Sequence, residues 1–136
     1  MELGGNAPFI VFDAAEIEMA VKGAIASKYR NAGQTCMCAN RILVQDGVYD
    51  SFTKRLAETA GAMKVADGFE PGAVIGPLID VKAVEKVEAR IADAVKKRVQ
   101  GGDRWQPRAG QHLCEPTVSV SAVPVAMSSA GSRRAR

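Results

Sequence analysis

The sequence predicts an α/β fold with a mostly parallel sheet flanked by helices, and three observations support that prediction. Short apolar runs alternate with longer segments whose apolar residues recur at helical spacing, which is typical of strand–helix alternation. The first of these runs is nearly continuous, so it suits a strand that is covered on both faces. Hydrophobic residues make up 47% of the 136 residues, which is enough for the core of one domain.

The first strand and the first helix are expected near the N-terminus. The strand is the apolar run at residues 7–12. The helix is expected from about Ala14 to Arg30, behind an N-cap at Asp13 and a capping-box acid at Glu16. Gly33 is expected to end this segment, because glycine readily adopts the left-handed conformation that follows a helix.

A second strand–helix pair follows. The run from Arg41 to Gln45 is expected to form a strand, and Asp46-Gly47 is expected to form the turn after it. Residues at helical spacing then predict a second helix with one apolar face. That face would contain Phe52, Leu56, either Thr59 or Ala60, and Met63.

The next segment is expected to contain a loop, a helix and two strands. Residues 68–76 predict the loop, and Asp80 is expected to cap the third helix. Short strands are expected to begin at Val99 and to run from Leu113 to Val120. The inward face of the third helix would consist of apolar residues, namely Ala83, Val84, Val87, Ile91, Ala94 and Val95.

Two regions are distinguished by composition. Residues 1–118 are expected to form the folded domain, and residues 119–136 form a divergent tail of small, polar and finally basic residues. The tail is expected to be disordered, and a lost reading frame is an alternative origin for it. Its arginines account for the net charge of +3, because the rest of the chain balances at 15 basic and 15 acidic residues.

Composition argues against several classes of partner and place. A neutral body with 5% aromatic residues does not favour nucleic-acid binding. No apolar run approaches the roughly 18 residues of a membrane span, and no secretory signal pattern is present, so a cytoplasmic setting is expected. Three cysteines in such a chain do not predict a disulfide framework, so they indicate reactive or buried thiols.

Cys36 is the candidate nucleophile, because it lies in a polar, glycine-containing junction between the first helix and the second strand. A free thiol has a pKa of roughly 8.5, so a nucleophilic thiol needs help from nearby cations or backbone N–H groups. Lys28, Arg30 and Arg41 are the local cations. The alternative is that Cys36 and Cys38 are small buried hydrophobic residues.

The C-x-C pattern of Cys36 and Cys38 leaves two other kinds of chemistry open. A metal-binding module is one, although the distant His112 and Cys114 do not match usual zinc spacing, so no metal site is expected. A reversible disulfide that blocks the nucleophile is the other, although its geometry would be strained. A thiol redox or metal-binding module built on this pair is therefore a rival to a catalytic site.

Two charged residues could complete a site around the thiol. Glu2 lies beside Gly4-Gly5, where the backbone can approach a ligand closely, so it could act as a general base or lie beside a cofactor. Its alternative is a solvated acid. Arg30, at the end of the first helix, could hold a substrate carboxylate by a bidentate contact, or could simply be a helix-end arginine in water.

The segments at 2–8 and 33–36 together resemble the two signatures of the aldehyde dehydrogenase superfamily, and their separation also matches. The linking segments at 27–41, 44–50 and 76–88 resemble succinate-semialdehyde dehydrogenases within it. The resemblance covers residues 1 to about 118, so it implies part of that family's catalytic domain.

The resemblance implies a role for each matching residue. Cys36 would attack the aldehyde carbon, and the resulting thiohemiacetal would pass hydride to NAD or NADP. Glu2 would then activate the water that hydrolyses the thioester. Leu3 would lie by the nicotinamide through its main chain, and Arg30 would bind the far carboxylate of succinate semialdehyde. Cys38 would be a regulatory redox partner of the nucleophile.

The chain also departs from the family pattern. The nucleotide-binding domain, the second oxyanion donor, a downstream glutamate strand and the segment for homo-oligomerisation are not found, so a truncated, inactive and aggregation-prone fragment is expected. The rival readings are a non-functional remnant, the thiol module described above, and an aldehyde dehydrogenase of another specificity.

Overall fold

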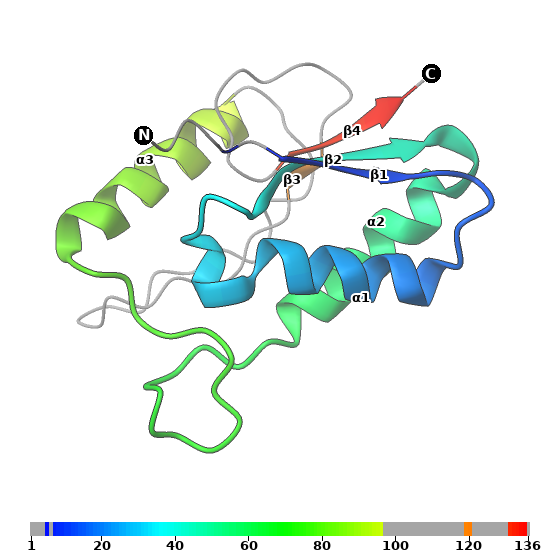
Figure 1. The fold of residues 1–136 in the computed structure, drawn as a ribbon. Coiled ribbons are helices and arrows are strands. Elements are labelled where there is room, and N and C mark those ends of the chain that lie inside the picture. The colour runs from blue at the N-terminus through cyan, green and yellow to red at the C-terminus, as the bar shows by residue number, and fades with distance from the viewer. Residues whose placement is uncertain (1–4, 6, 97–118, 121–130, 136) are drawn as a thin grey trace.

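The chain forms a four-stranded sheet with two of its helices packed on one face, as seen in a computed structural model that describes residues 5, 7–96, 119–120 and 131–135 (Figure 1). Its elements in chain order are β1 (Ala7–Val11), α1 (Ile17–Lys28), the short 3₁₀ helix η1 (Arg30–Gly33), β2 (Ala39–Gln45), α2 (Asp46–Gly61), α3 (Val81–Lys96), β3 (Ser119–Val120) and β4 (Gly131–Ala135).

The sheet confirms the predicted α/β class. Its strands lie in the order β1-β2-β4-β3, and each neighbouring pair is parallel. The register of β1 on β2 shifts between Ala7 and Pro8, whose partners are Ala39 and Arg41. This irregularity lies at the start of β2, so the sheet is locally distorted where the chain leaves the C-x-C segment.

The core lies between the sheet and helices α1 and α2, which run beneath it in Figure 1. Alternate residues of β1 and β2 point toward the helices, as a pleated strand requires. The expected apolar face of α2 is confirmed for Phe52, Leu56 and Ala60, which are buried, while Thr59 is half-buried and Met63 lies beyond the end of the helix. The core consists of Val11, Val21, Ala24, Ile42, Val44, Tyr49, Phe52 and Leu56.

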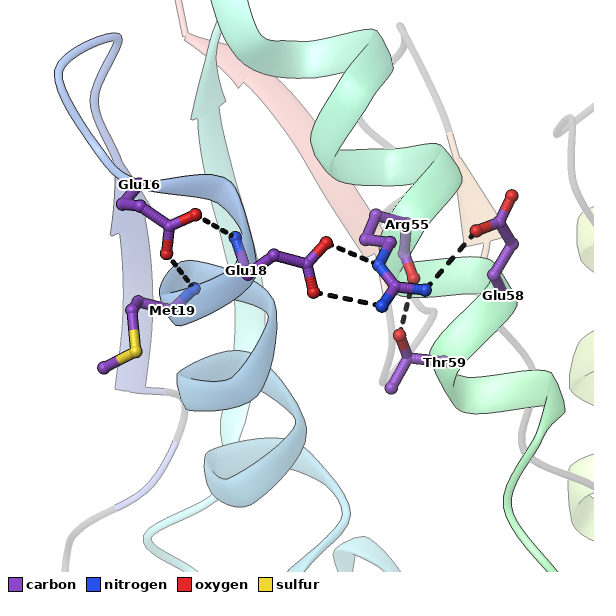
Figure 2. Close-up of polar contacts among 6 residues, drawn as sticks. All are labelled: Glu16, Glu18, Met19, Arg55, Glu58 and Thr59. Atoms are coloured by element: carbon purple, nitrogen blue, oxygen red, sulfur yellow. Dashed lines mark hydrogen bonds and ion pairs between the residues drawn. The ribbon is translucent and has the colours of Figure 1, made fainter.

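The start of α1 differs from the prediction. Asp13 does not cap the helix, because Glu16 is the N-cap and its carboxylate accepts hydrogen bonds from the backbone N–H groups of Glu18 and Met19, at 3.0 and 2.7 Å (Figure 2). The backbone N–H of Asp13 instead donates to the side chain of Gln45 at 3.0 Å. The helix therefore begins at Ile17 and ends at Lys28, inside the predicted range.

The expected Asp46-Gly47 turn is also wrong, because α2 begins at Asp46 directly after β2. A Cβ atom on Gly47 would lie 2.8 Å from the Asp13 carboxylate, so the two segments meet too closely for a larger residue. A carboxylate near the first turn of a helix also complements the helix dipole. Glycine is thus explained here by close packing rather than by a turn.

One polar contact joins α1 to α2 on the surface. The Arg55 guanidinium on α2 donates two hydrogen bonds to the Glu18 carboxylate on α1, at 2.6 and 3.0 Å (Figure 2). Glu58 lies 3.6 Å from the same guanidinium, and the Thr59 hydroxyl donates to the Arg55 carbonyl. This bidentate geometry fixes the two helices relative to each other at a solvent-exposed point.

Helix α3 and the loop before it agree with the prediction. Residues 68–76 contain no regular element, and the Asp80 carboxylate accepts a hydrogen bond from the N–H of Ala83 at 2.8 Å, which confirms the cap. The expected inward residues up to Ile91 are half-buried, whereas the side chains of residues 94 and 95 and the strand expected at Val99 lie outside the described part of the chain.

The C-terminal segment contributes to the sheet. Residues 119–120 and 131–135, which the sequence predicted to be disordered, form β3 and β4, and β4 pairs with the central strand β2. Of the strand predicted for 113–120, only the last two residues are described. The boundary at residue 118 stays a prediction. No helix in the described ranges is long and apolar enough to cross a membrane.

Candidate functional site

The candidate site lies on the connection from α1 to β2. Tyr29 ends α1 by donating its N–H to the carbonyl of Ile25 at 2.9 Å. The next residues form η1, within which Asn31 and Ala32 have positive φ values of 50° and 54°. Gly33 follows with a φ of 76°. Three successive left-handed residues therefore reverse the chain just before the C-x-C segment.

Local chemistry explains two of these three positions. Asparagine tolerates the left-handed region better than most residues, and glycine adopts it freely. A Cβ atom on Gly33 would also lie 3.1 Å from the carbonyl oxygen of Lys28. Ala32 carries a conformational cost of roughly 1–2 kcal/mol, and it packs against the small buried cluster of Val65 and Ile75.

Cys36 follows this turn and has an exposed, free thiol. The next residue, Met37, has 73% of its surface exposed, so both side chains are open to solvent. The position is chemically suitable for a nucleophile, because the reactant can reach the sulfur while the backbone is fixed by elements on both sides.

Cys38 is in the opposite situation, since its side chain is only 1% exposed. Its sulfur lies 2.8 Å from the Thr35 hydroxyl oxygen and 3.8 Å from the carbonyl oxygen of Arg30, to which the thiol donates. The Cys38 N–H also donates to the Thr35 carbonyl at 3.2 Å. The two cysteines of the C-x-C pattern are thus one exposed and one buried.

A cation lies beside the buried thiol. Lys28 donates from Nζ to the Asn40 side-chain oxygen at 3.3 Å. Burial lowers the pKa of Lys28, and a negative charge on the Cys38 sulfur would act in the opposite direction. Burial also raises the pKa of the neighbouring Tyr29 phenol to about 12. The end of α1 is therefore a poorly hydrated region beneath the Cys36 loop.

The structure locates three of the five predicted site residues. Arg30 and Cys36 both have exposed side chains on the same short connection, and Cys38 lies beneath it. Glu2 and Leu3 lie outside the described residues, as do His112 and Cys114. Among the residues the structure does describe, no group of three His, Cys, Asp or Glu side chains could hold a metal ion.

Sequence reasoning missed Thr35 and Asn40, which contact the buried Cys38 thiol and the partly buried Lys28, respectively. A hydroxyl three residues before a cysteine that ends a turn is a weak signal, because such residues more often face solvent. Their roles depend on which side of the turn is buried, and only the folded chain decides that.

The fold and the connection define a class of protein, namely a parallel α/β protein that presents a thiol at a helix–strand junction. The family comparison goes further. The profile of the Aldehyde dehydrogenase family matches residues 1–130. The chain belongs to the aldehyde dehydrogenase family, which confirms the resemblance found in its signatures.

Relatives of more than one specificity match the chain. It is 56% identical over 122 residues to succinate-semialdehyde dehydrogenase [NADP(+)] of Escherichia coli (strain K12). It is 63% identical over 122 residues to glutarate-semialdehyde dehydrogenase of Pseudomonas putida (strain KT2440). Each alignment covers 88% of this chain and 25% of the relative, so the chain spans about a quarter of the length of these proteins.

A solved structure has the same fold. The crystal structure of succinate-semialdehyde dehydrogenase from Burkholderia pseudomallei matches with a TM-score of 0.83 and 48% identity. The match covers 98% of this chain and 30% of that chain. The arrangement of helices and strands described above is therefore that of an aldehyde dehydrogenase segment.

Proposed function

We propose that the chain is the thiol-bearing part of an NAD(P)-dependent aldehyde dehydrogenase that oxidises a small semialdehyde, with succinate semialdehyde as the first candidate. The observation that carries the proposal is the exposed Cys36 thiol directly after a strained turn in a member of this family. The semialdehyde relatives support the substrate class.

The proposed chemistry begins at Cys36. Its thiolate attacks the aldehyde carbon and forms a C–S bond, which converts the carbonyl oxygen into an oxyanion. The backbone N–H of Cys36 is the proposed donor to that oxyanion. Nucleophilic attack needs an accessible sulfur, and the exposure of Cys36 supports this role.

Arg30 is the proposed carboxylate-binding residue. It starts η1, and its guanidinium is exposed on the same connection as the thiol. A guanidinium forms two parallel hydrogen bonds with a carboxylate, so it can hold the far end of a semialdehyde while its aldehyde end meets the thiol. Succinate and glutarate semialdehydes share this carboxylate, which fits both kinds of relative.

The cofactor contributes one step. NAD(P)+, when bound, accepts the hydride that converts the adduct on Cys36 into a thioester. The described residues fit its reactive end, because Cys36 and Met37 leave the sulfur open on its solvent side. Leu3 is proposed to contact the nicotinamide through its main chain. Glu2 is proposed to remove a proton from water, which then hydrolyses the thioester and frees the thiol.

The proposal also covers the cellular compartment and the oligomeric state of the intact enzyme. Free thiols at Cys36 and Cys38 are typical of a reducing compartment, which supports a cytoplasmic protein. The intact enzyme is proposed to be a homo-oligomer that binds a small aldehyde rather than nucleic acid or membrane. The rival readings, a non-functional remnant and a C-x-C redox or metal module, predict no role for Arg30 in attracting an anionic reagent to Cys36.

Alkylation of the chain itself tests the paired roles of Cys36 and Arg30. We expect the ratio of the alkylation rates with anionic iodoacetate and neutral iodoacetamide to be higher at Cys36 than in glutathione, because a nearby cation attracts the anionic reagent. Arg30→Gln should lower that preference roughly fivefold, since an exposed charge contributes about 1 kcal/mol at close range. Mass spectrometry of each labelled peptide gives both rates.

Arg90→Gln on α3 is the matched control, because it removes the same charge from another exposed position. It should leave the preference unchanged. High salt should weaken the preference in the unmodified chain, since salt screens exposed charges. Equal preference in the Arg30 and Arg90 variants would contradict the role given to Arg30.

A further inference from the structure

Cys38 is buried and hydrogen-bonded, yet the proposed chemistry does not use its thiol. The residue lies at the end of the connection that presents Cys36, immediately before β2. A buried thiol can be a simple space-filling residue. Here, however, its sulfur contacts polar groups from two other points of the same connection, which a space-filling role does not require.

We infer that Cys38 is a positioning residue, whose reduced thiol braces the turn that presents Cys36. This inference rests on the proposed function for its meaning, because bracing matters to catalysis only if Cys36 is the nucleophile. The brace itself is a property of the loop and can be measured without any substrate.

The hydrogen bonds around the sulfur are mutually consistent. The Cys38 thiol donates to the carbonyl of Arg30, so its one proton is used. The Thr35 hydroxyl at 2.8 Å can then donate to the sulfur, which acts as the acceptor. Each partner thus has a complementary role, as expected for a buried polar network.

These bonds join the two ends of the strained segment. The Arg30 carbonyl lies at its start, before the left-handed residues Asn31 and Ala32, and Thr35 lies directly before Cys36. Left-handed alanine persists only where neighbouring contacts hold it. The Cys38 sulfur contacts both ends of this segment, so the backbone at Cys36 is held in place while the Cys36 side chain stays exposed.

Lys28 completes the surroundings of the thiol. Its ammonium group is partly buried, donates to Asn40 at 3.3 Å, and is close enough to feel the charge state of Cys38. The brace therefore connects the last turn of α1 with the first residues of β2. A disulfide between Cys36 and Cys38 would need the buried sulfur to leave all of these partners.

Hydrogen exchange of the intact chain tests the brace. Cys38→Ala should raise the exchange rates of the loop amides, such as those of Ala32 and Gln34, by roughly fivefold or more, as expected for the loss of one or two net hydrogen bonds. Cys38→Ser keeps a donor and an acceptor, so it should stay within about twofold of the unmodified chain.

Two further variants separate local bracing from general stability. Thr35→Val removes the hydroxyl partner but keeps the volume, so it should raise loop exchange without exposing the core. Thr53→Ala is the matched control, because it removes a buried hydroxyl that bonds within α2 at 2.8 Å. It should lower the free energy of unfolding of the whole chain. It should not raise the exchange rates of the Cys36 loop amides more than those of the α2 amides.

The outcomes distinguish this inference from its rivals. Unchanged loop exchange rates in the Cys38→Ala and Thr35→Val variants would overturn it. Equal increases in loop exchange in Cys38→Ala and Cys38→Ser would also overturn it. If the alanine variant does not fold, the serine and valine variants decide. Labelling of Cys38 as fast as Cys36 would also overturn it, and a native Cys36–Cys38 disulfide formed without faster loop exchange would favour the redox pair.

The hydrogen-exchange test of the brace and the alkylation test of the proposed function can fail independently. Faster loop exchange without any iodoacetate preference would leave the brace standing and would count against the proposed function. If Cys38→Ala loses the iodoacetate preference and Cys38→Ser restores it, the brace and the proposed role of Cys36 are linked. A purely structural role of Cys38 would not depend on the hydrogen bonds of its side chain.

Discussion

At the scale of single residues, backbone conformation decides how the candidate nucleophile is presented. Ala32 and Gly33 both have positive φ values, and only glycine tolerates that region without cost. Gly33 also faces the carbonyl of Lys28, where a Cβ atom would come within 3.1 Å. The turn before Cys36 therefore depends on a residue with no side chain.

Gly33→Ala should destabilise the chain by about 1–2 kcal/mol, because it adds a left-handed alanine and a close contact at the same position. Urea unfolding followed by circular dichroism measures the change. Gly68→Ala is the control, since Gly68 has no positive φ and no atom within 4 Å of a Cβ at that position. Equal effects of the two substitutions would contradict this explanation.

The sequence predicted the glycine and the two cysteines of this site, but not their environments. Gly33 was expected because a glycine after an amphipathic helix commonly adopts the left-handed conformation. The exposed position of Cys36 and the buried position of Cys38 could not be predicted, because extended geometry would place both on one side. The turn at residues 35–38, in which the Cys38 N–H donates to the Thr35 carbonyl at 3.2 Å, breaks that alternation.

At the scale of elements, long-range contacts decided where the predicted helices begin. Asp13 was a reasonable N-cap from its local sequence, but its backbone N–H bonds to Gln45, which lies 32 residues away. Glu16 consequently caps α1. Helix α3 agreed with the prediction because the carboxylate of its cap, Asp80, accepts a hydrogen bond from a residue three positions later. Local signals were reliable where the partner was also local.

The contact between α1 and α2 predicts a pH dependence of stability. Arg55 holds the pKa of Glu18 below its ordinary value of 4.5, chiefly through hydrogen bonding. A lowered pKa in the folded chain stabilises it above the unfolded value, and that contribution is lost as pH falls through the folded pKa. Glu18→Gln should therefore destabilise the chain slightly near neutral pH and have less effect in acid.

Thermal unfolding between pH 7 and pH 3 measures this difference. The effect should be small, because exposed ion pairs contribute little to stability. Glu85→Gln on α3 is the control for removing an exposed acid. A Glu18→Gln effect that grows as the pH falls below 4.5 would have the wrong sign and would exclude the ion pair as its cause.

At the scale of the whole molecule, the fold class was predictable and the extent of the sheet was not. Alternating strands and helices indicated a parallel sheet, and β1 and β2 confirm it. The C-terminal segment lacks apolar periodicity, so its pairing with β2 as β4 had no local signal. Its contribution comes from main-chain hydrogen bonds, which any sequence without proline can supply.

The length of the chain sets what it can do alone. It spans about a quarter of the length of its semialdehyde dehydrogenase relatives. We therefore expect no NAD(P)-dependent oxidation of succinate semialdehyde by the isolated chain. Grafting it into a full-length relative supplies the remaining parts.

The most direct measurement is the activity of such a graft, in which this chain replaces the matching quarter of the E. coli succinate-semialdehyde dehydrogenase. We expect oxidation of succinate semialdehyde with NADP+. Cys36→Ala should lower kcat/KM by at least about a thousandfold, as loss of a covalent nucleophile does. Lys54→Ala, a change at an exposed position on α2, should leave it unchanged. Retained activity in the Cys36→Ala graft would contradict the assignment of Cys36 as the nucleophile.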